Sequence, residues 1–210
     1  MAKIIALFNN KGGVSKTTTT FHLGWKLAEK GYKTLIVDTD PQCNLTGLCL
    51  NTDKNNKLDN FYKENKNNLK DSLSPVFSGA LSPLVAANCY EFDENKNLFL
   101  LPGHIEFSEY DATYNIAENL TGSLIMFKNV PGALRNLLQM TAEKYGFNYI
   151  LVDMSPNISA TNANILMESD FFIVPCAPDY FCYMAIDSLT KVFPRWDRVY
   201  SQIKENDVFK

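Results

Sequence analysis

The sequence lacks the features that mark a disulfide-rich, zinc-binding, secreted or membrane-spanning protein. Its five cysteines are an odd number and include no C-x-x-C pair, which disfavours a disulfide framework and a zinc ribbon. The apolar run near the start ends before Asn9 and is too short for a signal peptide. No apolar run approaches the roughly 18 residues of a membrane span. We therefore expect a cytoplasmic protein whose cysteines are small, buried, reduced side chains.

Charge of either sign is also not in excess. The 20 basic and 23 acidic side chains give a net charge of -3, so no global basic field indicates nucleic acid, although a local basic patch is compatible with this balance. Hydrophobic residues make up 46% and charged residues 20% of the 210 residues, as in ordinary globular domains. This composition excludes disordered, collagen-like and coiled-coil chains, and the length predicts a single domain over residues 1–210.

Short apolar runs alternate with segments of helical periodicity along the chain. The runs have the pattern of strands buried on both faces of a parallel sheet, and they lie at 4–8, 34–37, 98–101, 149–152 and 171–174. Helices are predicted over 16–30, after Pro131 and over 160–167, whereas the Asn- and Lys-rich segment 51–72 is predicted to be a solvated excursion. The alternation predicts an α/β fold with a doubly wound, mostly parallel sheet.

The loop after the first predicted strand has the composition of a phosphate-binding loop. It reads NNKGGVSKTT over residues 9–18 and leads into a helix N-terminus, where N–H groups and the helix dipole favour phosphate. Lys16 is expected to reach the β- and γ-phosphates and Thr17 to bind Mg²⁺. Asn10 and Ser15 stand where the ordinary pattern G-x-x-x-x-G-K-[ST] has glycine. The residues predicted to contact nucleotide are Lys11, Gly12, Gly13, Val14, Ser15, Lys16, Thr17 and Thr18.

Four segments in this order resemble the ParA/MinD family of ATPases. Residues 11–17, KGGVSKT, are similar to the family's deviant Walker A motif, and residues 36–46, IVDTDPQCNLT, to the segment after its second strand. Residues 149–153, YILVD, resemble its Walker B strand, and residues 174–179 the stretch after its next strand. The resemblance extends from residue 3 to about residue 190. It implies a P-loop NTPase fold, with ATP and Mg²⁺ as cofactors.

The resemblance also implies roles for individual residues. Lys11 would cross a dimer interface to the partner's nucleotide, and Asp40 would position the attacking water or contacts to the metal. The catalytic set is then Lys11, Lys16 and Asp40, and the metal-binding set is Thr17, Asp40 and Asp153. Asp38 has two interpretations: a carboxylate of the site, or a side chain that bonds the backbone amides of the following turn.

The function implied by the resemblance is that of a Mg²⁺-dependent ATPase that dimerises on ATP and partitions a plasmid or a chromosome. A centromere-binding partner protein and nonspecific DNA are the expected partners, in the cytoplasm and at the nucleoid. The first strand begins near residue 3, so the short type without an N-terminal helix-turn-helix domain is expected. Four basic residues either bind DNA or form a solvated helix face: Lys191, Arg195, Arg198 and Lys204.

Other functions stay open. A MinD-like membrane-cycling ATPase needs a basic amphipathic C-terminal helix, for which residues 199–210 give little support. An iron–sulfur carrier ATPase is disfavoured because no paired cysteine motif is present. A catalytically weak P-loop binding module is the third alternative, because Ser15 replaces the usual glycine and the chain stops before the family's C-terminal strand, helix and adenine-binding residues.

Two further expectations concern backbone strain and aromatic packing. If the position of Ser15 needs a positive φ, a non-glycine residue there costs about 1 kcal/mol. The serine side chain then either crowds the phosphates or donates its hydroxyl to one. Five aromatic side chains near the last predicted strand are expected to pack in the core, with contact to a partner as the alternative: Phe171, Phe172, Tyr180, Phe181 and Tyr183.

Overall fold

The sheet of this protein is mostly parallel, as the sequence predicts. The computed structural model describes residues 1–50, 67–79, 82–119 and 129–205. In these residues six strands lie in the order β3-β4-β2-β5-β1-β6, and only the edge pair β3 and β4 is antiparallel. The strands are β1 (Lys3–Leu7), β2 (Thr34–Asp38), β3 (Tyr90–Glu91), β4 (Leu98–Leu101), β5 (Tyr149–Asp153) and β6 (Phe171–Ile173).

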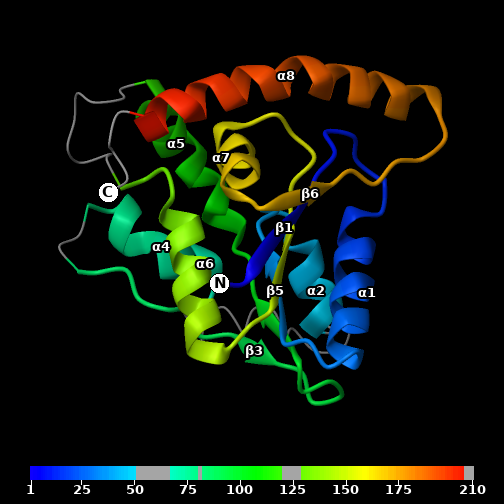
Figure 1. Ribbon diagram of the computed structural model, residues 1–210, viewed down its shortest axis with the longest axis vertical. Coiled ribbons are helices and arrows are strands. Elements are labelled where there is room, and N and C mark those ends of the chain that lie inside the picture. Colours follow the sequence, from blue (N-terminus) through cyan, green and yellow to red (C-terminus); the bar gives the residue numbers. More distant parts are fainter. Residues whose placement is uncertain (51–66, 80–81, 120–128, 206–210) are drawn as a thin grey trace.

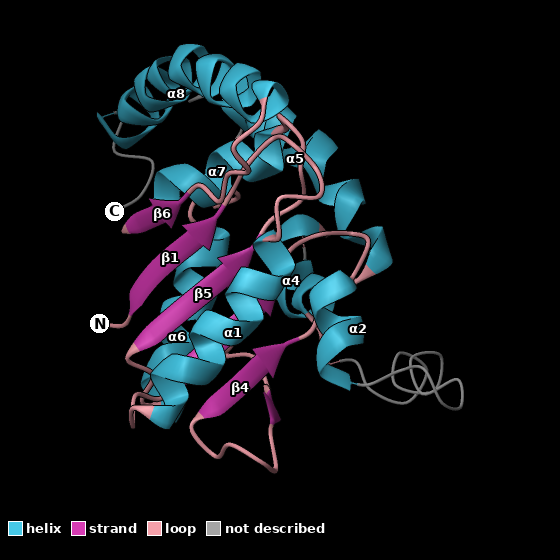
Figure 2. Ribbon diagram, turned by 90° about the vertical axis from the view of Figure 1, so that its right-hand side faces the viewer, coloured by secondary structure: helices cyan, strands magenta, loops and turns pink. Residues whose placement is uncertain are grey.

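Helices cover both faces of this sheet (Figure 2). One face carries α1 (Lys16–Glu29) and α2 (Asn44–Leu50). The opposite face carries α4 (Leu69–Phe77), α5 (Tyr110–Asn119), α6 (Ala133–Tyr145), α7 (Ala160–Glu168) and α8 (Tyr180–Glu205), with the short 3-10 helix η2 (Ile105–Glu109) leading into α5. Strand side chains alternate between the two hydrophobic cores, so Ile4 and Ala6 face the larger core and Leu7 the smaller one. The predicted doubly wound α/β fold is confirmed.

The helix predicted after Pro131 illustrates how local sequence sets an element. α6 begins after Gly132 and ends before Gly146, both of which have left-handed backbone conformations, with φ of 80° and 74°. Its predicted apolar stripe is buried against the sheet, at Leu134, Leu137, Leu138 and Thr141. None of the helices in the described residues is long and apolar enough to cross a membrane.

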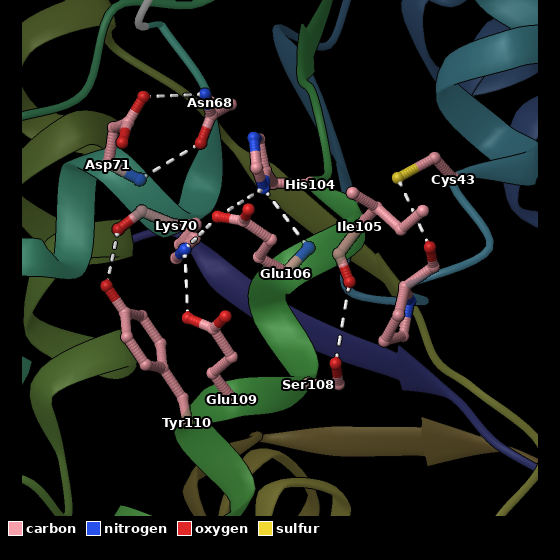
Figure 3. Close-up of polar contacts among 11 residues, drawn as sticks. Cys43, Asn68, Lys70, Asp71, His104, Ile105, Glu106, Ser108, Glu109 and Tyr110 are labelled. Carbon is pink, nitrogen blue, oxygen red and sulfur yellow. Dashed lines mark hydrogen bonds and ion pairs between the residues drawn. The ribbon is translucent and has the colours of Figure 1, made fainter.

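The predicted excursion over 51–72 is corrected in part. Residues 51–66 lie outside the described residues, but 69–72 belong to α4, whose Leu69 and Leu73 are fully buried. Figure 3 shows why this helix is anchored: the Lys70 ammonium pairs with Glu106 and with Glu109, the latter at 3.0 Å, both from η2. The contacts fix α4 against the segment that follows β4.

The aromatic residues near the last strand do not pack in the core, so that prediction is wrong. Their side chains are 47–71% exposed, because β6 is the edge strand of the described sheet and the first turns of α8 project beyond it (Figure 1). The expectation of buried cysteines is wrong for Cys176, which is exposed on the connection between β6 and α8. All five cysteines are free thiols.

Candidate nucleotide-binding site

The predicted phosphate loop and the predicted carboxylates meet at one edge of the sheet. Leu7 and Asp38 both lie opposite Asp153 in the strand register, so three neighbouring strands end at the same level. The loop from β1 to α1 begins at this edge, where open α/β sheets place their ligands. Tertiary structure thus brings together Thr17 and Asp153, which are 136 positions apart in the chain, because β5 inserts between β1 and β2.

The loop is closed around the ammonium group of Lys16. Its Nζ donates hydrogen bonds to the carbonyl oxygens of Asn9 at 3.1 Å and Lys11 at 3.3 Å. Burial lowers the pKa of Lys16, while the carboxylates of Asp153 and Asp40 act in the opposite direction. Around this lysine, Val14 is buried, and the other predicted loop contacts Gly12, Gly13 and Thr18 are exposed. A buried cation beneath exposed backbone amides suits a phosphate chain.

Thr17 and Asp153 connect the loop to the central strand. The Thr17 hydroxyl donates to Oδ2 of Asp153 at 2.7 Å, and the Thr20 hydroxyl donates to Oδ1 at 3.4 Å. Burial, with a contribution from the neighbouring carboxylates Asp38 and Asp40, raises the pKa of Asp153 to about 7, although the Thr17 hydrogen bond acts in the opposite direction. The carboxylates of Asp153 and Asp40 both act on the buried Lys16, so two acidic groups stand against one basic group, and this balance favours an added cation.

This donor set fits Mg²⁺, which prefers hard oxygen ligands and keeps several waters. The Thr17 hydroxyl and the Asp153 carboxylate are such ligands. Among the described residues, no three His, Cys, Asp or Glu side chains form a cluster that would hold a metal alone. The remaining ligands would therefore come from phosphate oxygens and water, as is usual for Mg²⁺ in nucleotide sites.

Asp38 is a structural residue that shapes the loop carrying Asp40. Its carboxylate accepts hydrogen bonds from the Thr46 N–H at 2.8 Å, the Thr46 hydroxyl at 2.7 Å and the Asp40 N–H at 3.2 Å. Burial raises the pKa of Asp38 to about 6. Asp40 accepts a hydrogen bond from the Gln42 N–H at 2.9 Å and is 8% exposed at the site edge. The turn-bonding interpretation of Asp38 is supported.

Sequence reasoning missed two residues that support this turn. The Thr46 hydroxyl accepts a hydrogen bond from the Gly103 N–H at 2.9 Å. A β-carbon at Gly103 would lie 3.0 Å from the Asp38 carbonyl oxygen, so the close approach of the segment after β4 to the end of β2 favours glycine at this position. Thr46 stands in the segment that resembles the ATPase family, but its role was visible only once β4 lay beside β2.

Lys11 points to the β6–α8 connection of its own chain. Its Nζ lies 2.5 Å from Oδ2 of Asp179 and 5.8 Å from the centre of the Phe181 ring. The hydrogen bond to Asp179 raises the pKa of Lys11, and the same contact lowers the pKa of Asp179. Figure 1 shows the orange β6–α8 connection beside the blue loop that follows β1, and the Asn9 side chain bonds this connection at Pro175. Sequence reasoning assigned no role to Asp179.

Ser15 has the positive φ that the sequence analysis considered for this position. Its φ is 62° and ψ 29°, and its side chain makes no capping hydrogen bond to α1. The exposed β-carbon and hydroxyl stand at the helix N-terminus, where a phosphate would approach the backbone amides. We therefore expect the Ser15 side chain to lower nucleotide affinity by crowding the phosphates.

Ser15→Gly should therefore tighten ATP binding about fivefold, or about 1 kcal/mol, because glycine removes the β-carbon and the hydroxyl that would crowd the phosphates. Calorimetric titration with ATP and Mg²⁺ measures the change. Ser15→Ala is the matched control: it removes the hydroxyl, keeps the β-carbon, and should bind no tighter than the natural protein. Equal or weaker binding by the glycine variant would show that the loop is adapted to serine.

Comparison of the sequence with known proteins identifies the family to which this chain belongs. A family model described as an AAA domain matches residues 2–206. The sporulation initiation inhibitor protein Soj of Bacillus subtilis is 30% identical over 90% of this chain, and the chromosome partitioning protein ParA of Caulobacter vibrioides is 27% identical over 94%. The chain belongs to the ParA/MinD-type P-loop ATPases. The resemblance predicted from four segments of the sequence is confirmed.

Solved structures show the same fold. A Corynebacterium diphtheriae protein superposes with a TM-score of 0.81 at 25% identity, covering 97% of this chain and 70% of that one. A cobyrinic acid a,c-diamide synthase of Mycobacterium smegmatis, solved with ADP and magnesium, superposes with a TM-score of 0.63 at 24% identity over 94% of this chain and 69% of that one. The chain spans 64% and 63% of the lengths of Soj and ParA.

Proposed function

We propose that this protein is a Mg²⁺-dependent ATPase that dimerises on ATP and acts in plasmid or chromosome partitioning. The observation that carries the proposal is the 2.7 Å hydrogen bond between the Thr17 hydroxyl and Asp153. It joins the phosphate loop to the strand that resembles Walker B, at the place where a P-loop ATPase binds Mg²⁺. The names of Soj and ParA support the partitioning role, and the ADP and magnesium in the Mycobacterium synthase support the cofactors.

The chemistry follows from how charge is arranged around the loop. Phosphoryl transfer needs positioning and charge neutralisation more than covalent catalysis. Lys16 and the amides of the loop would hold the β- and γ-phosphates, and Asp40, at the edge of the site, would orient the attacking water. Bound Mg²⁺ would supply further positive charge to the phosphates, with Thr17, Asp153 and Asp40 as the candidate residues around it.

Dimerisation and the partners are assigned from the family. In the proposed dimer Lys11 leaves Asp179 and reaches the nucleotide of the second copy. A centromere-binding protein on the plasmid or chromosome would stimulate hydrolysis. The dimer would associate with nucleoid DNA in the cytoplasm.

Phosphate release from ATP, with and without Mg²⁺, tests the enzymatic part. We expect Mg²⁺-dependent hydrolysis that falls at least about tenfold in Thr17→Ala and persists in Thr17→Ser, because serine keeps the hydroxyl that faces Asp153. Equal activity in the alanine variant would place the metal elsewhere. Absence of hydrolysis in the natural sequence, with ATP still bound, would contradict the ATPase proposal.

DNA binding, the next part of the proposal, should be dominated by phosphate contacts. Arg195 and Arg198 are exposed on α8, so Arg195→Glu together with Arg198→Glu should abolish a mobility shift seen with ATP at low salt. The shift of the natural protein should show no sequence preference and weaken steeply with added salt. Lys96→Glu, at the exposed β3–β4 turn, is the matched control. No shift at any concentration of the natural protein would remove DNA from the partners.

A second candidate is a P-loop module that binds nucleotide but turns it over poorly. The observation that favours it is the left-handed Ser15, because this residue places a side chain at the mouth of the loop. Tight ATP binding without hydrolysis in the natural protein, and hydrolysis gained in Ser15→Gly, would support this candidate.

A further inference from the structure

Two cysteines lie close together on the connection between β6 and α8, and the proposed ATPase mechanism uses neither. Cys176 is exposed in the loop, and Cys182 is buried in the first turn of α8. The Cys182 sulfur accepts a hydrogen bond from the Ala177 N–H at 3.2 Å, so it lies against the residue next to Cys176. The other three cysteines lie away from this connection, two of them in or beside α2 and the third just before β3.

The Cys176 sulfur is held only by weak contacts. Its thiol donates to the Val174 carbonyl oxygen at 3.3 Å, and the Asn9 amide nitrogen lies 3.9 Å away. A disulfide with Cys182 would therefore cost Cys176 only its hydrogen bond to Val174 and its contact with Asn9. The Ala177 N–H that bonds the Cys182 sulfur belongs to the peptide group that directly follows Cys176, so the Cys182 sulfur lies beside the Cys176 backbone, and a disulfide needs such a short approach.

We propose that Cys176 and Cys182 form a reversible regulatory disulfide when the protein meets a small-molecule disulfide such as oxidised glutathione. The thiolate of the exposed Cys176 attacks one glutathione sulfur, forms a mixed disulfide and releases the first glutathione thiolate. The thiolate of Cys182 then attacks the Cys176 sulfur, forms the protein disulfide and releases the second. The protein thiols lose two electrons and two protons, which the two glutathione molecules take up.

The first step is slow at neutral pH. Burial and the neighbouring Cys182 raise the pKa of Cys176, so its thiolate fraction is small and grows as the pH rises. Brief exposure to an oxidant would therefore leave the pair reduced, and sustained exposure would oxidise it.

The pair is coupled to Lys11 through Asp179. The Asp179 carboxylate accepts a hydrogen bond from the Cys182 N–H at 2.8 Å and pairs with the Lys11 ammonium at 2.5 Å. The Cys182 sulfur also interacts with Lys11 and contributes to its raised pKa. A disulfide that closes the loop around Asp179 would restrict the rearrangement that frees Lys11. The oxidised protein would keep Lys11 in its own chain and dimerise less, a consequence that rests on the proposed function.

Thiol titration after unfolding, combined with peptide mass mapping, tests the covalent step on the full chain. Incubation with oxidised glutathione should remove two of the five thiols, join the Cys176 and Cys182 peptides, and leave no bound glutathione. Cys182→Ala should retain a glutathione on Cys176, Cys176→Ser should acquire neither product, and Cys89→Ser should behave as the natural protein. A lasting glutathione adduct on natural Cys176, a bond to another cysteine, or no reaction would overturn the proposal.

Light scattering with a slowly hydrolysed ATP analogue tests the regulatory step. Oxidation should weaken dimer formation at least about fivefold, a reductant should restore it, and Cys176→Ser should not respond to the oxidant. Unchanged dimerisation by the oxidised protein would refute the regulatory role. If the reduced protein forms no dimer at all, the proposed function fails, whereas the disulfide is judged by the mass mapping.

Discussion

Lys11→Ala should abolish ATP-dependent dimerisation while leaving ADP affinity within a few-fold of the natural value. In the single chain the Lys11 ammonium contacts Asp179 and does not line its own loop, so its removal takes little from nucleotide binding by a monomer. That ion pair is exposed and contributes little to stability. In the proposed dimer the same ammonium meets the partner's phosphates. Loss of a buried, charged contact of this kind should weaken the dimer at least about thirtyfold, or ~2 kcal/mol.

Sedimentation or light scattering with a slowly hydrolysed ATP analogue measures the dimer, and calorimetry measures ADP affinity. Lys96→Ala is the matched control, because this exposed lysine pairs with Asp93 in the β3–β4 turn, away from the loop. If Lys11→Ala lost ADP affinity and dimerisation equally, Lys11 would act in its own chain's site, and the crossing role would be wrong.

Asp40→Asn and Asp40→Ala should both bind ATP and hydrolyse it at least about tenfold more slowly, which corresponds to about 1.4 kcal/mol of barrier. The structure separates two roles of this side chain. It accepts the Gln42 N–H hydrogen bond that shapes the turn, and asparagine can keep this bond. Only the carboxylate can take up a proton from water or bring a negative charge to a cation, and both substitutions remove it.

Single-turnover hydrolysis and ATP titration distinguish these roles, and thermal unfolding shows whether the turn survives. Asp93→Ala, at an exposed position of the β3–β4 turn, controls for loss of one negative charge. Full activity in Asp40→Asn with a loss in Asp40→Ala would make Asp40 a structural residue. Loss of ATP binding in both variants would assign it to ground-state binding.

Much of the fold could be predicted because its strands are buried on both faces. A parallel strand such as 149–153 has no polar face, so its sequence is a continuous apolar run. α6 could be predicted equally well, since its apolar stripe and its flanking glycines indicate the same helix. α4 was harder to recognise, because its helical state depends on Leu69 and Leu73 reaching the core and on the ion pairs of Lys70 with η2.

The aromatic residues in β6 and at the start of α8 were misinterpreted for a physical reason. Phe171, Phe172 and Phe181 have the composition of a core, but composition does not tell whether a strand lies inside a sheet or at its edge. Sheet order decides this, and the described sheet ends at β6. The same limit applies to Cys176, whose exposure follows from its position at that edge.

The sequence by itself determined the strand–loop–helix unit with Lys16 and Thr17, because a phosphate loop is local and its residues are consecutive. It also identified Asp38, Asp40 and Asp153 as strand-end carboxylates. Only the tertiary structure decided their contacts: insertion of β5 between β1 and β2 placed Asp153 against Thr17, and the hydrogen bonds of Thr46 with Asp38 and Gly103 made Asp38 a turn residue. The contact of Lys11 with Asp179 also depended on the tertiary fold, because side chains 168 positions apart meet only after β6 pairs with β1.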